Sequence, residues 1–228
     1  MAAERRELEG LLVHVDGVTK PDWPLDFARL GRLHGEWMAA VANGPGPQLA
    51  AAAVDVVKQH GEEEHRMITG IVSIGFCGGL QATLRACDIF VAAEVSDVTS
   101  VLQPAASNSF KSGKLLSIDR VVSTAAEKAE LAKTGADAIE MEAAAVGERA
   151  KQYNVPFYVV RVVTDTSAED FPVDFNQMRS EDGHFSRCKI LTSALRAPTR
   201  VIPELIKLNQ RTKRASQALG DFLADARF

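Results

Sequence analysis

Apolar residues recur along the chain in short runs that are typical of buried strands. Continuous apolar runs predict strands at residues 67–74, 88–95 and 156–163. Two further runs, 27–33 and 36–41, flank His34-Gly35 and predict a hairpin. The first of the continuous runs leads into the glycine-rich stretch Gly75-Phe-Cys-Gly-Gly79.

Other stretches show helical spacing. Residues 8–15 resemble the end of an N-terminal helix, and the alanine- and valine-rich residues 48–58 predict a buried helix. Thr124-Ala-Ala-Glu127 is a capping-box pattern that opens a helix over 125–133, and a second helix is expected from about 138 to 152. Polar loops are expected at 96–113 and 165–173, and helices punctuated by Pro198 and Pro203 after them.

Strands that alternate with helices favour a layered α/β fold with a largely parallel sheet. No linker or repeat divides the sequence, so a single domain over residues 1–228 is expected.

Composition narrows the functional classes. The chain has 228 residues, of which 46% are hydrophobic and 25% charged, with a formal net charge of −4. This balance argues against a general binder of nucleic acid or of anionic membranes. No apolar run approaches the roughly 18 residues of a membrane span. Three cysteines without a Cys-x-x-Cys pair favour a reduced, cytoplasmic protein, and the five scattered histidines lack metal-ligand spacing.

Two acidic positions stand out from the pattern alone. On a helix, Glu142 would share one apolar stripe with Ile139 and Val146, where a carboxylate is costly unless it has hydrogen-bonding partners. Glu140 would lie on the other side, exposed to solvent. A structural cap or ion pair is the alternative role for Glu142. Asp165 follows an apolar strand, where open α/β sheets bind ligands, although a turn or helix cap would also explain it.

Two further features have both a structural and a functional interpretation. Arg161 interrupts the same apolar strand and needs an acidic or carbonyl partner if it is buried. The glycines of Gly75-Phe-Cys-Gly-Gly79 allow a close approach of backbone to a ligand, or simply form a turn.

In order along the chain, these segments resemble the purine nucleoside phosphorylase/uridine phosphorylase superfamily, and most closely its methylthioadenosine/S-adenosylhomocysteine nucleosidase branch. The resemblance rests on these segments: Ala3-Glu-Arg-Arg-Glu7-Leu8, Asn43-Gly-Pro-Gly-Pro47, Gly75-Phe-Cys-Gly-Gly-Leu80, Cys87-Asp-Ile-Phe-Val91, Ile139-Glu-Met-Glu142 and Val155-Pro-Phe-Tyr-Val-Val-Arg-Val-Val-Thr-Asp165. It spans about residues 3–180. It implies a three-layer αβα sandwich with a mixed, largely parallel central sheet.

The resemblance also implies a mechanism. Asp165 would protonate the purine, Glu142 would accept hydrogen bonds from the ribose hydroxyls, and Met141 would pack on the sugar. Glu7 would orient or deprotonate the attacking water, and Arg161 would support the acidic site from behind. No metal or other cofactor is implied. Relatives assemble as dimers or hexamers, so a homo-oligomer is expected.

The nucleophile depends on the anion pocket. Phosphorolytic relatives carry Arg-x-Gly-Ser/Thr-x-Gly, whereas this chain has Ser73-Ile-Gly-Phe76-Cys77-Gly78. The arginine and the hydroxyl are both absent, and the Phe76 ring replaces the latter. Hydrolysis of a purine nucleoside, with adenine as the favoured base, is therefore the expected reaction. The alternatives are a phosphorylase whose phosphate is held by other residues, and a non-catalytic nucleoside-binding member.

Three departures from the family pattern bear on the substrate. Met1 lies almost inside the N-terminal motif, which predicts either a later start than in relatives or a missing core strand and a weakly held Glu7. The stretch between Val95 and Lys114 is short. Val121-Val122 replaces the Phe-Ile that flanks adenine in relatives. A shortened pocket suits a bulky apolar 5′ substituent, as in the hopanoid-associated nucleosidases, which remove adenine from adenosylhopane.

Overall fold

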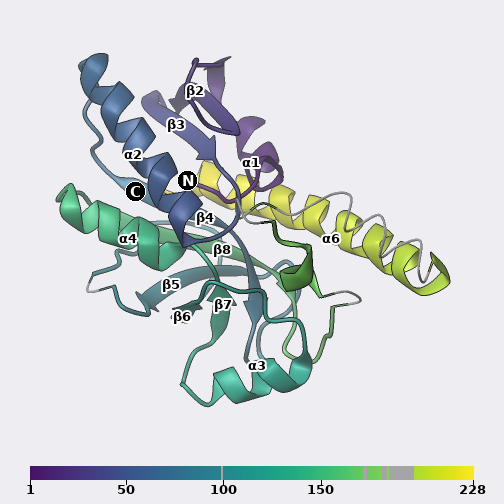
Figure 1. Cartoon of the computed structure of the whole chain (residues 1–228). Coiled ribbons are helices and arrows are strands. Elements are labelled where there is room, and N and C mark those ends of the chain that lie inside the picture. Colours follow the sequence, from purple (N-terminus) through teal and green to yellow (C-terminus); the bar gives the residue numbers. More distant parts are fainter. Residues whose placement is uncertain (99, 172–173, 181–183, 185–197) are drawn as a thin grey trace.

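A computed structural model describes residues 1–98, 100–171, 174–180, 184 and 198–228, without the side chains at 198–202 and 204–205 (Figure 1). Cys188 lies outside these ranges. The elements follow one another along the chain as α1 (Arg5–Leu12), β1 (Asp16–Thr19), β2 (Phe27–Leu33), β3 (Glu36–Ala42), α2 (Pro47–Glu63), β4 (Ile71–Gly79), β5 (Ile89–Val95), β6 (Lys111–Ser117), α3 (Ala125–Ala132), β7 (Ala138–Glu140), α4 (Ala143–Gln152), β8 (Phe157–Asp165), the short 3₁₀ helix η1 (Phe175–Met178) and α6 (Pro198–Asp225).

The central sheet is mixed and curls until it closes. Its five strands follow the order β4-β7-β6-β5-β8 around a closed barrel. The pairs β4–β8, β5–β6 and β6–β7 are parallel, and β4–β7 and β5–β8 are antiparallel. The expected α/β class with a mixed, largely parallel sheet is confirmed. Closure of the sheet is an added feature that no local pattern indicates.

The predicted hairpin is confirmed and belongs to a second sheet. Strands β2 and β3 pair antiparallel from Phe27–Ala42 to Leu33–Glu36, and β1 adds to the outside of β2. His34 and Gly35 form the turn with positive φ angles of 55° and 85°. This conformation is the one that tight two-residue hairpin turns require.

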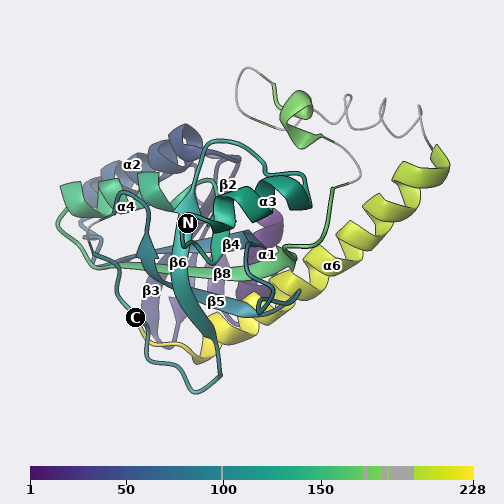
Figure 2. The ribbon, with the colours of Figure 1, turned by 90° about the horizontal axis from the view of Figure 1, so that it is seen from below.

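Helices cover the barrel in two groups. Helices α2 and α4 pack against each other on one side, and α1 packs against α6 on another (Figures 1 and 2). Each group of helices contributes to a buried apolar cluster. Leu8, Val160 and Leu219 belong to one cluster, and Val54 and Val146 belong to another. The N-terminal half of α6 extends away from the body in Figure 2. No helix within the described ranges is both long and apolar enough to cross a bilayer.

Two expectations about helices are wrong. The single helix expected over residues 138–152 is a three-residue strand, β7, followed by α4 from Ala143. Ile139 is apolar because it belongs to a buried strand, and its spacing from the apolar residues of α4 imitates a helical stripe. A strand of three residues is too short to show the alternation that would distinguish it from a helix. Pro203 does not interrupt the last helix but lies inside α6. It removes one backbone hydrogen bond from a helix of 28 residues.

Candidate active site

Three strand ends bring the predicted acidic residues to one part of the barrel. Gly78 of β4 pairs with Ile139 of β7 on one side and with Asp165 of β8 on the other. Adjacent strands lie about 4.8 Å apart, so Ile139 and Asp165 are separated by about 10 Å across β4. Glu142 follows shortly after β7 ends at Glu140. Asp165 therefore lies beside Gly78 of β4, and Glu142 follows the strand on the other side of Gly78.

Glu7 is held against this segment by backbone amides. It occupies the third position of α1, where its Oε2 accepts hydrogen bonds from the N–H groups of Ala3 (2.7 Å) and Glu4 (2.9 Å). Its Oε1 accepts from the N–H of Phe76 at 2.9 Å. Burial raises the pKa of Glu7 to about 7, against the lowering effect of these amides. A carboxylate with this pKa can take a proton near neutral pH.

The close approach of Glu7 to β4 depends on a glycine. Gly75 has a φ of +154°, and a Cβ at this position would lie 2.7 Å from Glu7 Oε1. Only glycine leaves room for the carboxylate there. This contact gives the glycine-rich stretch a definite structural role.

Glu142 lies between β7 and α4, at the N-cap of α4. Its Oε1 accepts a hydrogen bond of 2.8 Å from the N–H of Gly46, in the turn that leads into α2. Gly46 has a φ of +105°, a conformation that favours glycine. Burial, with added repulsion from Glu140 and Glu7, raises the pKa of Glu142 to about 8.

The expectation that Glu140 is exposed is wrong. Glu140 and Arg161 are 6% and 1% exposed, and Arg161 Nη2 lies 2.6 Å from Glu140 Oε2. The same nitrogen donates to Ser73 Oγ at 2.8 Å, and Glu140 also accepts from the N–H of Ala143. Glu140 faces inward because it ends a buried strand rather than standing on a helix. Arg161 is thus the buried cation beside an acidic cluster formed by Glu7, Glu140 and Glu142, and its ion-pair partner Glu140 comes from β7.

Asp165 ends β8 in a buried position, 5% exposed. Its Oδ2 contacts Lys128 Nζ at 2.6 Å, and its Oδ1 accepts from the hydroxyl of Thr164 at 2.8 Å. Burial raises the pKa of Asp165, whereas Lys128 and Thr164 act in the opposite direction. A Cβ on Gly78 would lie 2.9 Å from Asp165 Oδ2, so this glycine also admits a carboxylate.

The remaining predicted residues surround these groups to different extents. Cys77 is buried in β4, and burial raises the pKa of its thiol, which keeps it neutral. Phe76 is half-buried against the core cluster beside α1 and α6. Val122 is buried in a small cluster with Leu80 and Ile139. Met141 lies between β7 and α4, partly exposed, next to Glu142.

Sequence reasoning missed Lys128, which contacts the predicted proton donor. It is the buried residue of α3 and precedes the half-buried Leu131 and Ala132 by three and four positions. Such spacing places all three on one helix face. The sequence did contain a signal for this role, because a lysine on the apolar face of a capped helix indicates a buried cation that needs an acidic partner.

The start of the chain is tied into both sheets. The Met1 amine donates to Val72 O, Ile74 N–H donates to Met1 O, and Ala2 N–H donates to Val41 O. With three amides on its carboxylate, Glu7 is not weakly held, so the part of the second alternative that predicted a weakly held Glu7 is wrong.

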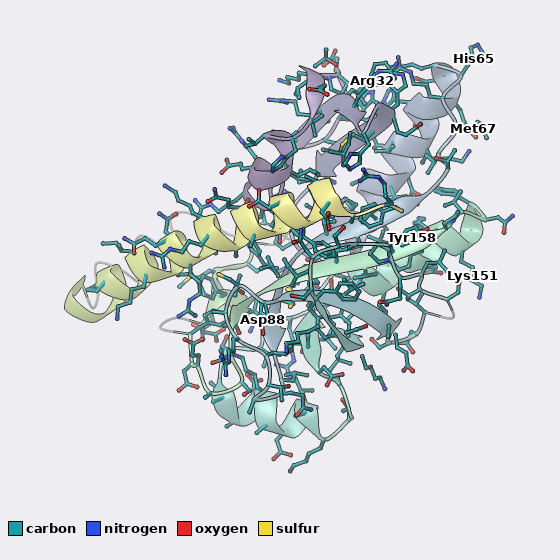
Figure 3. All side chains as sticks on the ribbon, turned by 180° about the vertical axis from the view of Figure 1, so that it is seen from behind. Arg32, His65, Met67, Asp88, Lys151 and Tyr158 are labelled. Carbon is teal, nitrogen blue, oxygen red and sulfur yellow. The ribbon has the colours of Figure 1, made fainter. Side chains whose placement is uncertain are left out.

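A separate apolar cavity of about 480 Å³ lies beside Met1, between β3, α2 and β4. Its lining includes Trp37, Met67 and Tyr158, the last two labelled in Figure 3. None of the predicted site residues lines it. Across the described ranges no group of His, Cys, Asp or Glu side chains has the arrangement of a metal site.

Residues 105–195 match the model of the Phosphorylase superfamily. A 5'-methylthioadenosine/S-adenosylhomocysteine nucleosidase of Shewanella sediminis is 39% identical over 54 residues, 24% of each chain. Its counterpart in Shewanella denitrificans is 25% identical over 194 residues, 71% of this chain and 82% of the relative. The match thus covers about a quarter of the first relative's length.

Solved structures share the fold across nearly the whole chain. The 5'-methylthioadenosine/S-adenosylhomocysteine nucleosidase of Neisseria meningitidis, in complex with methylthio-immucillin-A, superposes with a TM-score of 0.70 at 21% identity, over 98% of this chain and 95% of that one. Futalosine hydrolase of Helicobacter pylori gives 0.67 at 17% identity, over 98% and 94%. Together with the match of residues 105–195, these similarities confirm the resemblance of the chain to the phosphorylase superfamily.

Proposed function

We propose that the protein hydrolyses the N-ribosyl bond of a purine nucleoside, with adenine as the preferred base. The proposal is supported by two acids held on one glycine-bearing segment of β4, Glu7 at Phe76 and Asp165 at Gly78. It is supported as well by Glu142, which is near enough to Glu7 for their repulsion to raise its pKa. These carboxyl groups come from three different parts of the chain. Each has a raised pKa, which is typical of groups that exchange protons at functional sites.

Asp165 is the proposed proton donor. The bond between C1′ and the purine nitrogen breaks with its electron pair going to the base, which leaves readily once a ring nitrogen is protonated. The Asp165 proton moves to that nitrogen, and a carboxylate remains. The buried position of Asp165 favours the protonated form before the reaction.

Glu142 is the proposed partner of the ribose. Its carboxylate would accept hydrogen bonds from ribose hydroxyls while positive charge develops at C1′. Once Glu142 and Glu7 are ionised, their charges and that of Glu140 exceed the single positive charge of Arg161, and the cluster then favours a cation at the sugar. Hydroxyl donors would lower the pKa of Glu142, so substrate binding should release a proton near neutral pH.

Water is the proposed nucleophile. Its oxygen forms the new bond to C1′, and Glu7, when ionised, takes the proton that water loses. The position of the phosphate-binding arginine of phosphorolytic relatives is occupied by Ser73, which is 1% exposed and bound to Arg161. Arg161 itself is committed to Glu140. These contacts support hydrolysis over phosphorolysis.

The test is a product analysis. Purified protein is incubated with adenosine, methylthioadenosine, S-adenosylhomocysteine or inosine, with and without inorganic phosphate, and the products are separated chromatographically. We expect free base and free ribose or its 5′-substituted form, at rates independent of phosphate. Strict dependence on phosphate, with a sugar 1-phosphate as product, would identify a phosphorylase. Bound nucleoside without free base would identify a non-catalytic member.

Variants separate the roles of the two central acids. Glu142→Gln and Asp165→Asn should each reduce turnover by about 10²–10⁴-fold, the usual contribution of a positioned acid or base. The exposed Glu148 of α4 provides a matched control. Glu148→Gln is the same substitution of glutamate by glutamine, made on the surface and away from the acidic cluster. Turnover retained in both site variants would contradict the assignment.

Two further expectations concern the location and the assembly of the protein. A reducing, cytoplasmic location is in keeping with the free thiols of Cys77 and Cys87. A homo-oligomer, dimer or hexamer, remains the expected assembly, and light scattering of the purified protein tests it.

A further inference from the structure

Lys128 has a set of contacts that none of the proposed catalytic steps uses. It is 0% exposed, and its ammonium lies 2.6 Å from Asp165 Oδ2. The same nitrogen donates to the carbonyls of Thr166 at 2.8 Å and Glu169 at 2.9 Å. These three acceptors match the three N–H donors of an ammonium group. A fully enclosed lysine with this geometry faces the candidate proton donor.

The other charged groups around this pair are engaged elsewhere. The Glu169 carboxylate forms an ion pair with Arg211 of α6, and Arg211 also donates to the carbonyl of Thr164. On α3 itself, Glu127 pairs with Arg120 near the surface. From β4, Cys77 contributes a thiol that burial keeps neutral. Among the described residues, Lys128 is thus the cation in direct contact with Asp165.

A buried acid that gives up its proton needs a partner for the charge that remains. An unpaired carboxylate in a buried site is costly, and an adjacent ammonium removes most of that cost. The second oxygen of Asp165 has a different environment. The Thr164 hydroxyl lies 2.8 Å from Oδ1 and 3.3 Å from the carbonyl of Cys77, so it can donate to either. When it donates to Cys77, Oδ1 is left to carry a proton.

We propose that Lys128 is a positioning residue for the proton donor Asp165: it holds Oδ2 and stabilises the carboxylate that forms when Oδ1 gives its proton to the departing base. The inference rests on the proposed nucleosidase function and deepens it. The glycosidic electron pair goes to the purine, the proton moves from Oδ1 to a ring nitrogen, and Lys128 keeps all its protons. Asp165 is protonated again from solvent after the base has left.

The test compares two leaving groups in Lys128→Met. A purine nucleoside needs a proton to leave, whereas 4-nitrophenyl β-D-ribofuranoside releases a stable anion without one. We expect the ratio of purine to nitrophenyl turnover to fall by about 10-fold or more, at the low end of acid catalysis. Lys128→Arg, which keeps the charge, should restore much of the ratio. An equal loss for both substrates would indicate a merely structural lysine and overturn the inference.

The pH profile gives an independent readout. The high-pH limb of kcat/KM for the purine nucleoside reports loss of the Asp165 proton. Removing the ammonium raises the pKa of Asp165, so in Lys128→Met this limb should move to higher pH, and in Lys128→Arg it should stay. An unchanged limb in Lys128→Met would contradict the proposed role.

A second variant covers the case in which Lys128→Met does not fold. Lys128→Met combined with Asp165→Asn leaves no unpaired charge, and it should be no slower on the purine nucleoside than Asp165→Asn alone. A further loss in the double variant would show that Lys128 acts other than through Asp165. If the unsubstituted protein releases no base from any nucleoside, the proposed function fails, and the inference fails with it. Failure of the inference alone requires an active unsubstituted protein.

Discussion

Glu142→Gln should change how the stability of the protein depends on pH. In the folded protein, burial beside Glu140 and Glu7 raises the pKa of Glu142 from 4.5 to about 8. Between these values the unfolded chain has an ionised Glu142, whereas the folded protein keeps its proton. The unfolded state then binds fewer protons, so the free energy of unfolding falls as pH rises through this window. Glutamine cannot ionise and lacks this decline.

The size of the effect follows from the two pKa values. At about 1.36 kcal/mol for each pH unit, the interval from 4.5 to about 8 corresponds to about 5 kcal/mol. Glu142 is only partly buried, and water screens part of this effect, so we expect about 2–3 kcal/mol. Below the lower pKa the two proteins should be nearly equal in stability. Above the upper pKa the glutamine variant should be the more stable one.

Urea denaturation followed by circular dichroism, from about pH 5 to about pH 8.5, measures this difference. Glu7 contributes a decline of the same sign to both proteins, so the difference between them reports Glu142 together with its repulsion by Glu7. Glu148→Gln, on the exposed face of α4, is the control and should follow the unsubstituted protein. Parallel curves for Glu142→Gln and the unsubstituted protein would refute the reasoning about the buried acidic cluster.

Three further predictions concern the frame of the site. Arg161→Met should lower the free energy of unfolding by about 3–5 kcal/mol in urea titrations, because it leaves Glu140 buried without its partner; a loss below about 1 kcal/mol would argue against a charged pair. Gly78→Ala places a Cβ 2.9 Å from Asp165 Oδ2 and should slow base release by about 10-fold or more with little change in Tm, whereas unaltered kinetics would mean that Asp165 tolerates displacement. Thr124→Ala removes the hydroxyl that accepts from the N–H at position 127 and should cost about 1 kcal/mol; an unchanged urea midpoint would contradict the capping role.

Local patterns predicted the elements whose signals lie within a few residues. The hairpin of β2 and β3 was readable because His34-Gly35 interrupts two apolar runs, and Thr124 marks the start of α3 with its own hydrogen bond. Strand β8 was readable as an apolar run, expected over 156–163, and in the structure it extends to Asp165, which was expected in the following loop. These signals need no knowledge of the rest of the chain.

The interior of the site depends on contacts between distant residues, and local patterns do not contain them. Glu140 and Arg161 are 21 residues apart, and their pairing follows from the strand β7, which is too short to show a period of two. Lys128 reaches Asp165 only because α3 packs beside the end of β8. Closure of the barrel joins β5 to β8, which likewise depends on the whole chain.

The central claim is that Asp165 supplies the proton with which a purine leaves its ribose. The most direct measurement is the rate at which free adenine appears from an adenine nucleoside, without added phosphate, for the unsubstituted protein and for Asp165→Asn. The account predicts steady release by the former and a rate at least about 10²-fold lower for the latter. Equal rates of adenine release by the two proteins would contradict it.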